Sequence, residues 1–281
     1  MSSGMEGGSP PVSLALFDSG VGGLSVAREI LAHYRPPELV YLADNAHHPY
    51  GDRTLGEVRE LAEGAIRLLS QLGVEEVVIA CNTASAALAG REKCSGIRVW
   101  NLIEIGLRHL SEMLDGAGAR VGLIATPATV ASQSYPRIAR HLGLGLEFVS
   151  VSSARLAPLI ERGQVTGEEV EEEIRRAILP LAREGIRALI LGCTHYPLAR
   201  RAFQAVMARL GMGGVLLYDP AYGLARELGD EMGAFEQASG PTWLRAILTA
   251  PSDSFVSLAE ACLIGVRVEV ELVGQLGVNI P

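Results

Sequence analysis

The chain has 281 residues, of which 48% are hydrophobic, and its formal net charge is −8. This length suffices for two domains of ordinary size or for one large α/β unit with a sizeable core. The sequence contains no basic stripe, so we expect no binding to nucleic acid, which depends on Lys and Arg side chains that neutralise phosphates. Since no apolar run approaches membrane-spanning length, we expect no membrane partner either.

Residue usage also bears on cofactors and compartment. Lys93 is the only lysine and stands in a polar stretch without a motif, whereas a pyridoxal enzyme needs a Schiff-base lysine. We therefore expect no pyridoxal cofactor. Residues 1–11 are rich in Gly, Ser and Pro and contain no apolar leader, so they are predicted to be a disordered N-terminus. Four cysteines without a CxxC motif indicate a cytoplasmic protein with reduced thiols.

Strand-like and helix-like segments alternate along almost the whole chain. Strands are predicted over residues 12–18, 39–44, 76–81, 98–103, 120–125, 146–151, 188–193, 215–219, 243–248 and 266–273. Helices are predicted over residues 24–34, 54–72, 130–142, 166–184, 197–210, 224–232 and 254–263. Thr166 and Glu169 are expected to form a capping box on the fourth helix. The alternation predicts an α/β fold with mainly parallel sheets flanked by helices.

The order of motifs indicates an internal duplication. Asp18 and Cys81 are 63 positions apart, and Thr126 and Cys193 are 67 positions apart, each pair joining a strand–turn motif to a strand–cysteine motif. We therefore expect two α/β lobes, the first from residues 12–104 with 215–281 and the second from residues 105–214. The carboxyl ends of both sets of strands would face a shared cleft, where ligands bind in such sheets.

The two cysteine motifs read VVIACNTAS around Cys81 and LILGCTHYPL around Cys193. In each, an apolar strand delivers a thiol at its carboxyl end, beside the start of a helix, where the helix terminus stabilises a thiolate and can lower the pKa of the thiol. A lone cysteine in this position is more often a buried structural residue. The second copy in an equivalent place favours two acid/base thiols that face one small substrate from opposite sides.

Two such thiols suit the inversion of a carbon stereocentre. One fixed base removes a proton from one face while one fixed acid returns a proton to the other, and no cofactor is needed. Holding the substrate between the two groups supplies the orientation. The site must also exclude solvent and stabilise the substrate carboxylate as negative charge moves into it.

Polar residues beside the two cysteines are candidates for substrate contacts. Asn82 and Thr83 can bind a carboxylate together with backbone N–H groups. Thr194 follows the second cysteine directly, and His195 can orient that thiol, contact the carboxylate, or serve only as a helix cap. The remaining candidates are Asp18 and Ser19 after the first strand, Tyr50 and Gly51 in a covering loop, and Thr126 and Thr129 in the second lobe.

Each of these candidates has a plainer alternative. Asp, Ser and Thr at strand ends are also the favoured helix caps, and Glu161 is by default a surface carboxylate. A zinc site with Cys81, Cys193, His195 and His47 or His48 as ligands is a further alternative, although the spacing fits no compact zinc motif, so we expect no metal. Apart from that alternative, both loop histidines are expected at the surface, and Cys94 and Cys262 are expected to be structural thiols.

At these residues the sequence resembles the glutamate racemases of the cofactor-independent aspartate/glutamate racemase superfamily. The matching segments are FDSGVGGLSV, LADNAHHPYG, VVIACNTASA, ATPAT, PLIERG and LGCTHYPL, which run in the family's order over nearly the whole chain. The resemblance implies two lobes related by a pseudo-twofold axis and a substrate cleft between them. It also implies interconversion of L- and D-glutamate, which supplies D-glutamate for peptidoglycan, and a homodimer.

The resemblance carries roles onto individual residues. It implies that Cys81 exchanges a proton with D-glutamate and that Cys193 exchanges one with L-glutamate. Asp18, His195 and Glu161 match polar residues thought to assist the thiols. The residues implied to line the substrate site are Asp18, Ser19, Tyr50, Gly51, Asn82, Thr83, Thr126, Thr129, Thr194 and His195.

Some segments depart from the family pattern, and other functions stay open. NLIEIG lacks a proline often found after that glutamate, His48 stands where an apolar or small residue is commoner, and SSARLAPL replaces a segment that often contains another cysteine. An aspartate racemase, or a racemase of another acidic or hydantoin-type substrate, would differ in a side-chain pocket that the sequence does not reveal. A non-catalytic amino-acid-binding protein would not need the thiols, and a thiol redox protein is disfavoured by the missing CxxC.

Overall fold

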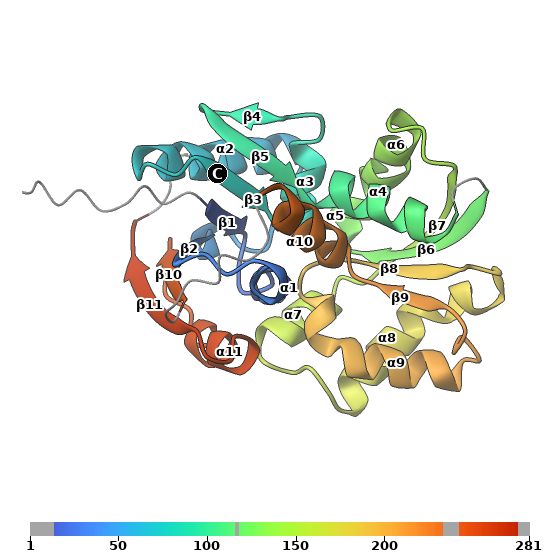
Figure 1. The fold of residues 1–281 in the computed structure, drawn as a ribbon. Coiled ribbons are helices and arrows are strands. Elements are labelled where there is room, and N and C mark those ends of the chain that lie inside the picture. The colour runs from blue at the N-terminus through green and yellow to red at the C-terminus, as the bar shows by residue number, and fades with distance from the viewer. Residues whose placement is uncertain (1–13, 116–117, 233–241, 275–281) are drawn as a thin grey trace, which may run out of the picture.

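The computed structural model describes residues 14–115, 118–232 and 242–274. Over these residues the chain forms two sheets of mainly parallel strands with helices packed on their faces, which confirms the predicted α/β class (Figure 1). No helix in the described ranges has the length and apolar character needed to cross a membrane. The N-terminal segment predicted to be disordered lies outside the described residues.

The larger sheet has seven strands in the order β11-β10-β2-β1-β3-β5-β4. Its strands are β1 (Leu14–Asp18), β2 (Glu38–Ala43), β3 (Glu76–Ile79), β4 (Lys93–Cys94), β5 (Ile97–Asn101), β10 (Trp243–Leu248) and β11 (Arg267–Leu272). All pairings are parallel except that of β4 with β5. The helices of this lobe are α1 (Leu24–His33), α2 (Leu55–Gln71), α3 (Asn82–Ala87) and α11 (Phe255–Cys262), with short 3₁₀ turns η1 (Asn45–His47) and η2 (Tyr50–Asp52).

The smaller sheet has four parallel strands in the order β7-β6-β8-β9. They are β6 (Ala119–Ala125), β7 (Leu146–Ser152), β8 (Ala188–Gly192) and β9 (Leu216–Tyr218). Its helices are α5 (Pro127–Ala131), α6 (Ser134–His141), α7 (Leu156–Glu161), α8 (Glu168–Ile178) and α9 (Arg200–Arg209), with 3₁₀ turns η3 (Leu179–Arg183) and η4 (Tyr196–Ala199). The order matches β2-β1-β3-β5 of the larger sheet, so the duplication predicted from the motifs is present in the topology.

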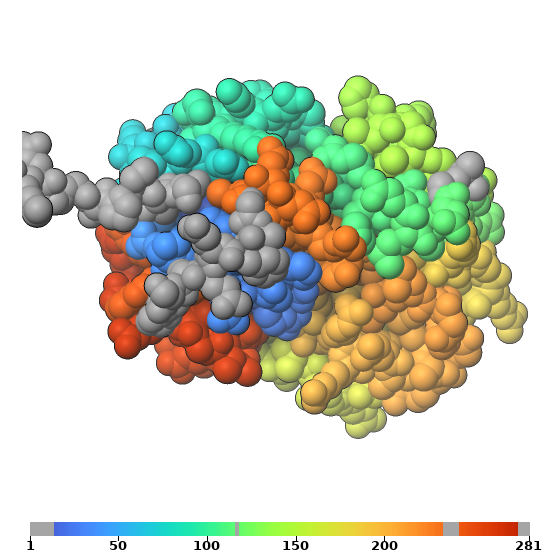
Figure 2. All heavy atoms as spheres, viewed as in Figure 1, coloured from blue at the N-terminus to red at the C-terminus, as the bar shows by residue number. Residues whose placement is uncertain are grey.

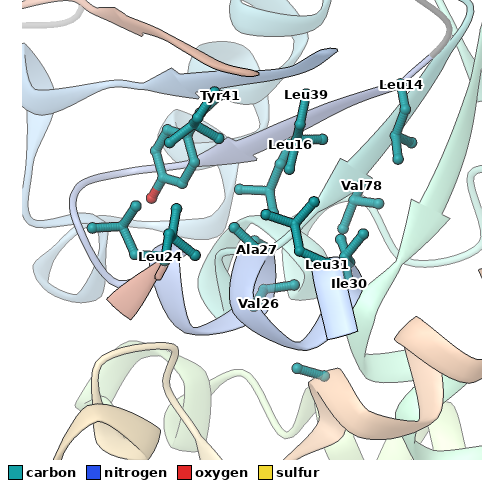
Figure 3. Close-up of a cluster of buried hydrophobic side chains, with 14 of the residues drawn as sticks. Leu14, Leu16, Leu24, Val26, Ala27, Ile30, Leu31, Leu39, Tyr41 and Val78 are labelled. Atoms are coloured by element: carbon teal, nitrogen blue, oxygen red, sulfur yellow. The ribbon is translucent and has the colours of Figure 1, made fainter. Parts of the chain in front are cut away.

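Strand β1 explains why the first motif is a continuous apolar run. Leu14 and Leu16 belong to the core on one face of the sheet, and Ala15 and Phe17 belong to the core on the other face. Figure 3 shows the two leucines packed with side chains of α1 such as Ile30. A strand covered on both faces has no polar side to alternate with, which is typical of parallel sheets.

Two helices join the lobes. In α4 (Leu102–Met113), Ile105 packs in the core of the first lobe while Leu107 packs against the second sheet. Helix α10 (Pro220–Glu231) packs on both α1 and α4. In the space-filling view, α10 lies between the blue α1 and the green α4 (Figure 2). The lobes are therefore connected by helix packing as well as by the chain itself.

One predicted boundary between the lobes is wrong. Strand β9 was expected to begin the return to the first lobe at residue 215, but it pairs with β8 in the smaller sheet. The described chain returns at α10, after Asp219 has capped that helix by accepting a hydrogen bond from the Ala221 N–H. An isolated three-residue apolar run cannot indicate which sheet it will join, because strand partners are set by distant residues.

Several predicted elements end or divide earlier than expected. The strand predicted over 98–103 ends at Asn101, whose side chain caps α4. The helix predicted over 130–142 is broken into α5 and α6 at Gln133, which has a left-handed backbone with φ 53°. The helix predicted over 166–184 becomes 3₁₀ after Ile178. Its expected capping box is absent from the described structure of α8, since Gly167 occupies the cap position without a side-chain hydrogen bond.

The packing of α4 on α10 depends on a glycine. A Cβ built on Gly106 would lie 2.6 Å from Cβ and 2.9 Å from Cα of Pro220. We expect Gly106→Ala to lower the free energy of unfolding by about 1–3 kcal/mol, because overpacking forces the helices apart. Denaturant titration measures this change.

Gly56 provides the matched control for that substitution. It lies in the exposed first turn of α2, and a Cβ there would have only the Thr54 hydroxyl nearby, at 3.9 Å. Gly56→Ala should raise the free energy of unfolding by up to about 1 kcal/mol through the lower entropy of the unfolded chain. Equal effects of both substitutions would contradict the role given to the α4–α10 contact.

Candidate functional site

The two cysteines lie at matching places in the two lobes. Cys81 follows β3 and occupies the cap position of α3, while Cys193 follows β8 directly. Because β3 and β8 hold corresponding positions in the two sheets, their carboxyl ends bring both thiols to the same cleft. Each cysteine is only 6% exposed. The duplication thus delivers one thiol from each lobe.

Both thiols line one pocket, which we call the interlobe pocket. It is lined by residues 19, 48–52 and 81–83 of the first lobe and by residues 126–127, 153–154, 157–158 and 193–195 of the second. The pocket contains about 520 Å³ of empty space up to its open mouth. A small polar molecule held there would have a thiol on either side.

The surroundings of the Cys81 thiol contain a hydroxyl and a carboxylate. The Ser19 hydroxyl lies 3.6 Å from Cys81 Sγ. Asp18 is fully buried, and its Oδ1 accepts a hydrogen bond of 3.0 Å from the Gly20 N–H. Both residues stand at the end of β1, where the first motif turns towards α1. The end of β1 therefore lies beside the first thiol.

The surroundings of the Cys193 thiol contain an imidazole. His195 Nδ1 lies 3.6 Å from Cys193 Sγ, and its Nε2 contacts the Glu161 carboxylate at the end of α7. His195 is 3% exposed. Glu161 is thus no solvated surface carboxylate, since its side chain is 22% exposed and paired with the histidine. The expected link between these residues and the second thiol is present in the geometry.

Hydrogen bonds cross the cleft beside the pocket. The Thr194 hydroxyl donates to Asp18 Oδ2 over 3.1 Å, and the Ser25 hydroxyl donates to the Thr194 carbonyl over 2.8 Å. On the other side of the pocket, the hydroxyls of Thr83 and Thr129 are 3.2 Å apart. Candidate residues of one lobe therefore position those of the other.

The loop containing Tyr50 and Gly51 approaches the second lobe closely. The Tyr50 hydroxyl donates to buried Asp44 over 2.6 Å, which fixes the ring in the pocket wall. A Cβ on Gly51 would lie 3.0 Å from Cβ of Thr126 across the cleft. A glycine at this place allows the loop to close over the pocket.

Burial decides the protonation of Cys81. Together with the negative charge of Asp18, it raises the pKa of this thiol to about 12, although the N–H of Ala84 opposes the shift. The expected lowering of the pKa by the helix terminus is therefore wrong for Cys81. The start of a six-residue helix offsets only part of the cost of burying a thiolate.

The pKa values of Asp18 and His195 are both raised, but for different reasons. Burial raises the pKa of Asp18 to about 6, although the positive charge of His195 opposes the shift. Burial alone would lower the pKa of His195, but its hydrogen bonds to Cys193 and Glu161 raise it well above its ordinary value. A positively charged His195 has its Nδ1 only 3.6 Å from Cys193 Sγ. The site therefore favours the protonated form of Cys81.

The structure gathers the predicted site residues into one place. Those that line the interlobe pocket are Ser19, Tyr50, Gly51, Cys81, Asn82, Thr83, Thr126, Cys193, Thr194 and His195. Those that lie behind them and hold them by hydrogen bonds are Asp18, Thr129 and Glu161. Cap roles coexist with these places, because Thr126 also caps α5. Cys94 and Cys262 lie outside the pocket lining, as expected.

Two parts of the pocket were missed or misplaced by sequence reasoning. His47 and His48 were expected at the surface, but His47 is 6% exposed and bonded to Asp44, and His48 lines the pocket. Ser153, directly after β7, also lines the pocket, and its hydroxyl accepts a hydrogen bond from the Leu156 N–H at the start of α7. Its place after a parallel strand was the signal that could have identified it.

The zinc site considered from the sequence takes a different form. The structure brings together His48, Glu161 and His195, whose ligand atoms all lie within 4.8 Å of one another, and this group contains neither Cys81 nor Cys193.

The family model of Asp/Glu/Hydantoin racemases matches residues 24–228, and the chain belongs to this family. A glutamate racemase of Desulforudis audaxviator is 37% identical over 215 residues, which cover 76% of this chain and 77% of that protein. A crystal structure of a glutamate racemase from Bacillus anthracis has a TM-score of 0.81 and 31% identity, covering 94% of this chain and 98% of that one. The glutamate racemase of Francisella tularensis in complex with D-glutamate has a TM-score of 0.79 and 27% identity, with coverage of 94% and 98%.

The raised pKa of Cys81 predicts that the two thiols are alkylated at different rates. At about pH 8 we expect iodoacetamide to label Cys193 faster than Cys81, because the thiolate is the reactive form and the pKa of Cys81 is about 12. Equal exposure of 6% removes accessibility as an explanation. Peptide mass spectrometry over time measures both rates. His195→Asn should slow labelling of Cys193, and faster labelling of Cys81 in the unaltered protein would contradict the assignment.

Asp18 predicts a pH-dependent loss of stability. Its pKa rises from the ordinary value of 3.8 to about 6 in the folded protein, so between these values the folded chain keeps a proton that the unfolded chain has lost. Stability from this group is therefore complete below about pH 4 and falls as the pH rises through about 6. The total loss is up to about 3 kcal/mol.

The comparison with Asp18→Asn isolates this effect. The free energy of unfolding of the variant minus that of the unaltered protein should be larger at about pH 7.5 than at about pH 4.5. Denaturant titrations at the two pH values provide the measurement. A difference between the two proteins that stays constant with pH would rule out a buried, perturbed carboxylate at this position.

Proposed function

We propose that the chain acts as a glutamate racemase, which interconverts L- and D-glutamate by two-base proton transfer without a cofactor and so supplies D-glutamate for peptidoglycan. The observation that carries the proposal is the pair of thiols at equivalent strand ends on opposite sides of the interlobe pocket. Family membership and the glutamate racemases among the similar proteins support the choice of reaction and substrate.

The proton transfers follow from the two thiols. The Cys193 thiolate removes the α proton of L-glutamate, and the Cys81 thiol donates its proton to the opposite face of the same carbon. Cys193 then is a thiol and Cys81 a thiolate, which is the state needed to act on D-glutamate in the reverse direction. Such positioned acid and base groups each contribute about 10²–10⁴-fold to the rate.

Polar groups of both lobes suit the charged ends of the substrate. Asn82 and Thr83 of the first lobe and Thr194 of the second can hold carboxylate oxygens between the thiols. Substrate charge would also change the environment of Cys81, because a substrate ammonium group near Asp18 compensates the negative charges there. The buried pocket strengthens each of these interactions by excluding water.

Asp18 and Glu161 are proposed to act through other residues. Glu161 contacts His195, and so holds the imidazole whose other nitrogen faces Cys193. Asp18 accepts from Thr194, which follows Cys193 in the chain. Both carboxylates therefore position the groups that contact the thiol or the substrate.

Isotope exchange tests the two-base mechanism. Each glutamate enantiomer is incubated with the protein in D₂O without added cofactor, and Cα deuterium and optical rotation are followed together. We expect deuterium to enter the product enantiomer, because the returning proton comes from a thiol equilibrated with solvent. Cys81→Ala and Cys193→Ala should each lower the rate of racemisation by at least about 100-fold.

Cys262→Ala is the matched control, since this cysteine lies on α11, away from the pocket lining. It should leave the rate of racemisation unchanged. Racemisation that survives loss of either Cys81 or Cys193 would overturn the mechanism. Activity on aspartate but not glutamate would leave the two-thiol mechanism in place and assign the chain to the alternative, an aspartate racemase.

The proposal includes two further parts implied by the family resemblance. We place the protein in the cytoplasm, where its four free cysteines would stay reduced. We also propose that two copies associate as a homodimer. Analytical ultracentrifugation tests the dimer, and a sedimentation coefficient of the monomer at enzyme-assay and higher concentrations would contradict it.

A further inference from the structure

His48 has an unsatisfied nitrogen beside the pocket. It stands in the loop between η1 and η2, and its Nδ1 is buried without a hydrogen-bond partner in the described part of the chain. A buried polar atom without a partner is uncommon and requires an explanation. Neutral histidine nitrogens of this kind are the commonest protein ligands for transition metals.

Two further ligand groups lie close to the His48 ring. The ligand atoms of His48, Glu161 and His195 all lie within 4.8 Å of one another. The rings of the two histidines have centroids 5.9 Å apart. The three side chains come from a loop of the first lobe, the end of α7 and the segment after β8, so the group bridges both lobes.

Gly20 leaves room between the side chains of His48 and Glu161. A Cβ on Gly20 would lie 3.0 Å from His48 Nδ1 and 3.2 Å from Glu161 Oε1. Both atoms therefore border the space that a side chain at this position would occupy. Glu161 Oε2 meets His195 Nε2 on its other side. Small movements of these side chains would bring all three to one ion.

We propose that His48, Glu161 and His195 form a binding site for Zn²⁺ that inhibits the enzyme. Two imidazoles and one carboxylate are a ligand set that zinc accepts, with a fourth position left for water. The inhibition rests on the proposed function, whereas the binding of Zn²⁺ does not, because binding needs no catalysis. An ion on His195 Nε2 replaces the contact with Glu161 and so disturbs the imidazole whose Nδ1 lies beside Cys193 Sγ.

Metal titration tests the site directly. Zn²⁺ is titrated into the full-length protein by calorimetry, Co²⁺ is followed by visible absorption, and racemisation of glutamate is measured at each Zn²⁺ concentration. We expect one ion per chain, Co²⁺ bands of a low-coordinate site, and a rate that falls with occupancy. His48→Asn should lower metal affinity at least about tenfold, as loss of even an indirect partner commonly does.

Each variant is compared with its own metal-free rate. His141→Asn removes an exposed histidine of α6 and should leave Zn²⁺ affinity unchanged. Glu161→Gln provides a second ligand variant with nearly the same shape, should His48→Asn fail to fold by circular dichroism. Unchanged affinity in the ligand variant that folds, or absence of binding by the unaltered protein, would overturn the proposal.

Two further results separate this proposal from others. A strong sulfur-to-cobalt charge-transfer band that disappears in Cys193→Ala would assign the ion to the thiol and overturn the site. Binding that depends on His48 in a protein that racemises neither glutamate nor aspartate would support the metal site and contradict the proposed function instead.

Discussion

The hydrogen bonds that cross the cleft hold the rest of the site in place. Thr194 receives a hydrogen bond from Ser25 at its carbonyl and donates one to Asp18 from its hydroxyl, so a single residue joins the strand ends of both lobes. Buried polar groups require such partners, because each unsatisfied group costs about 1–3 kcal/mol. The same bonds that satisfy these groups set the spacing between the segments carrying the two thiols.

The site combines features that oppose stability. A fully buried Asp18 with a pKa near 6 and a cysteine with a pKa near 12 both lie where ionisation is costly. Burial makes these costs large, and it also strengthens any interaction with charge that develops on a molecule bound beside these groups. The packing of α4 and α10 and the two cores around the larger sheet supply stability away from the cleft.

Local sequence patterns predicted those features of the fold that depend on neighbouring residues in the chain. The apolar strands ending in Cys81 and Cys193 and their places at the cleft were predicted from sequence, because strand ends in parallel sheets have a known relation to ligand sites. The pattern T-x-x-E was less informative. It forms a capping box at Thr54 and Glu57, but at Thr166 the intervening Gly167, with φ 103°, takes the cap position.

Features that depend on distant residues were not predicted. The partner of β9, the position of His48 against the second lobe, and the raised pKa of Cys81 all depend on residues far away in the chain. Burial of a thiol cannot be judged from its neighbours in sequence, so the helix terminus was given too much weight. Glu161 became a site residue only through the family resemblance, and its contact with His195 supplies the physical reason.

The two lobes repeat their strand order but differ in the groups beside each thiol, with Ser19 at Cys81 and His195 at Cys193. Enantiomers have equal free energies in water, so any catalyst that interconverts them works at an equilibrium constant of unity. The value of kcat/KM must then be the same in both directions. For such a reaction, the unequal surroundings of the thiols can give the two enantiomers different values of kcat and of KM, as long as the ratio kcat/KM stays the same. They cannot favour one product at equilibrium.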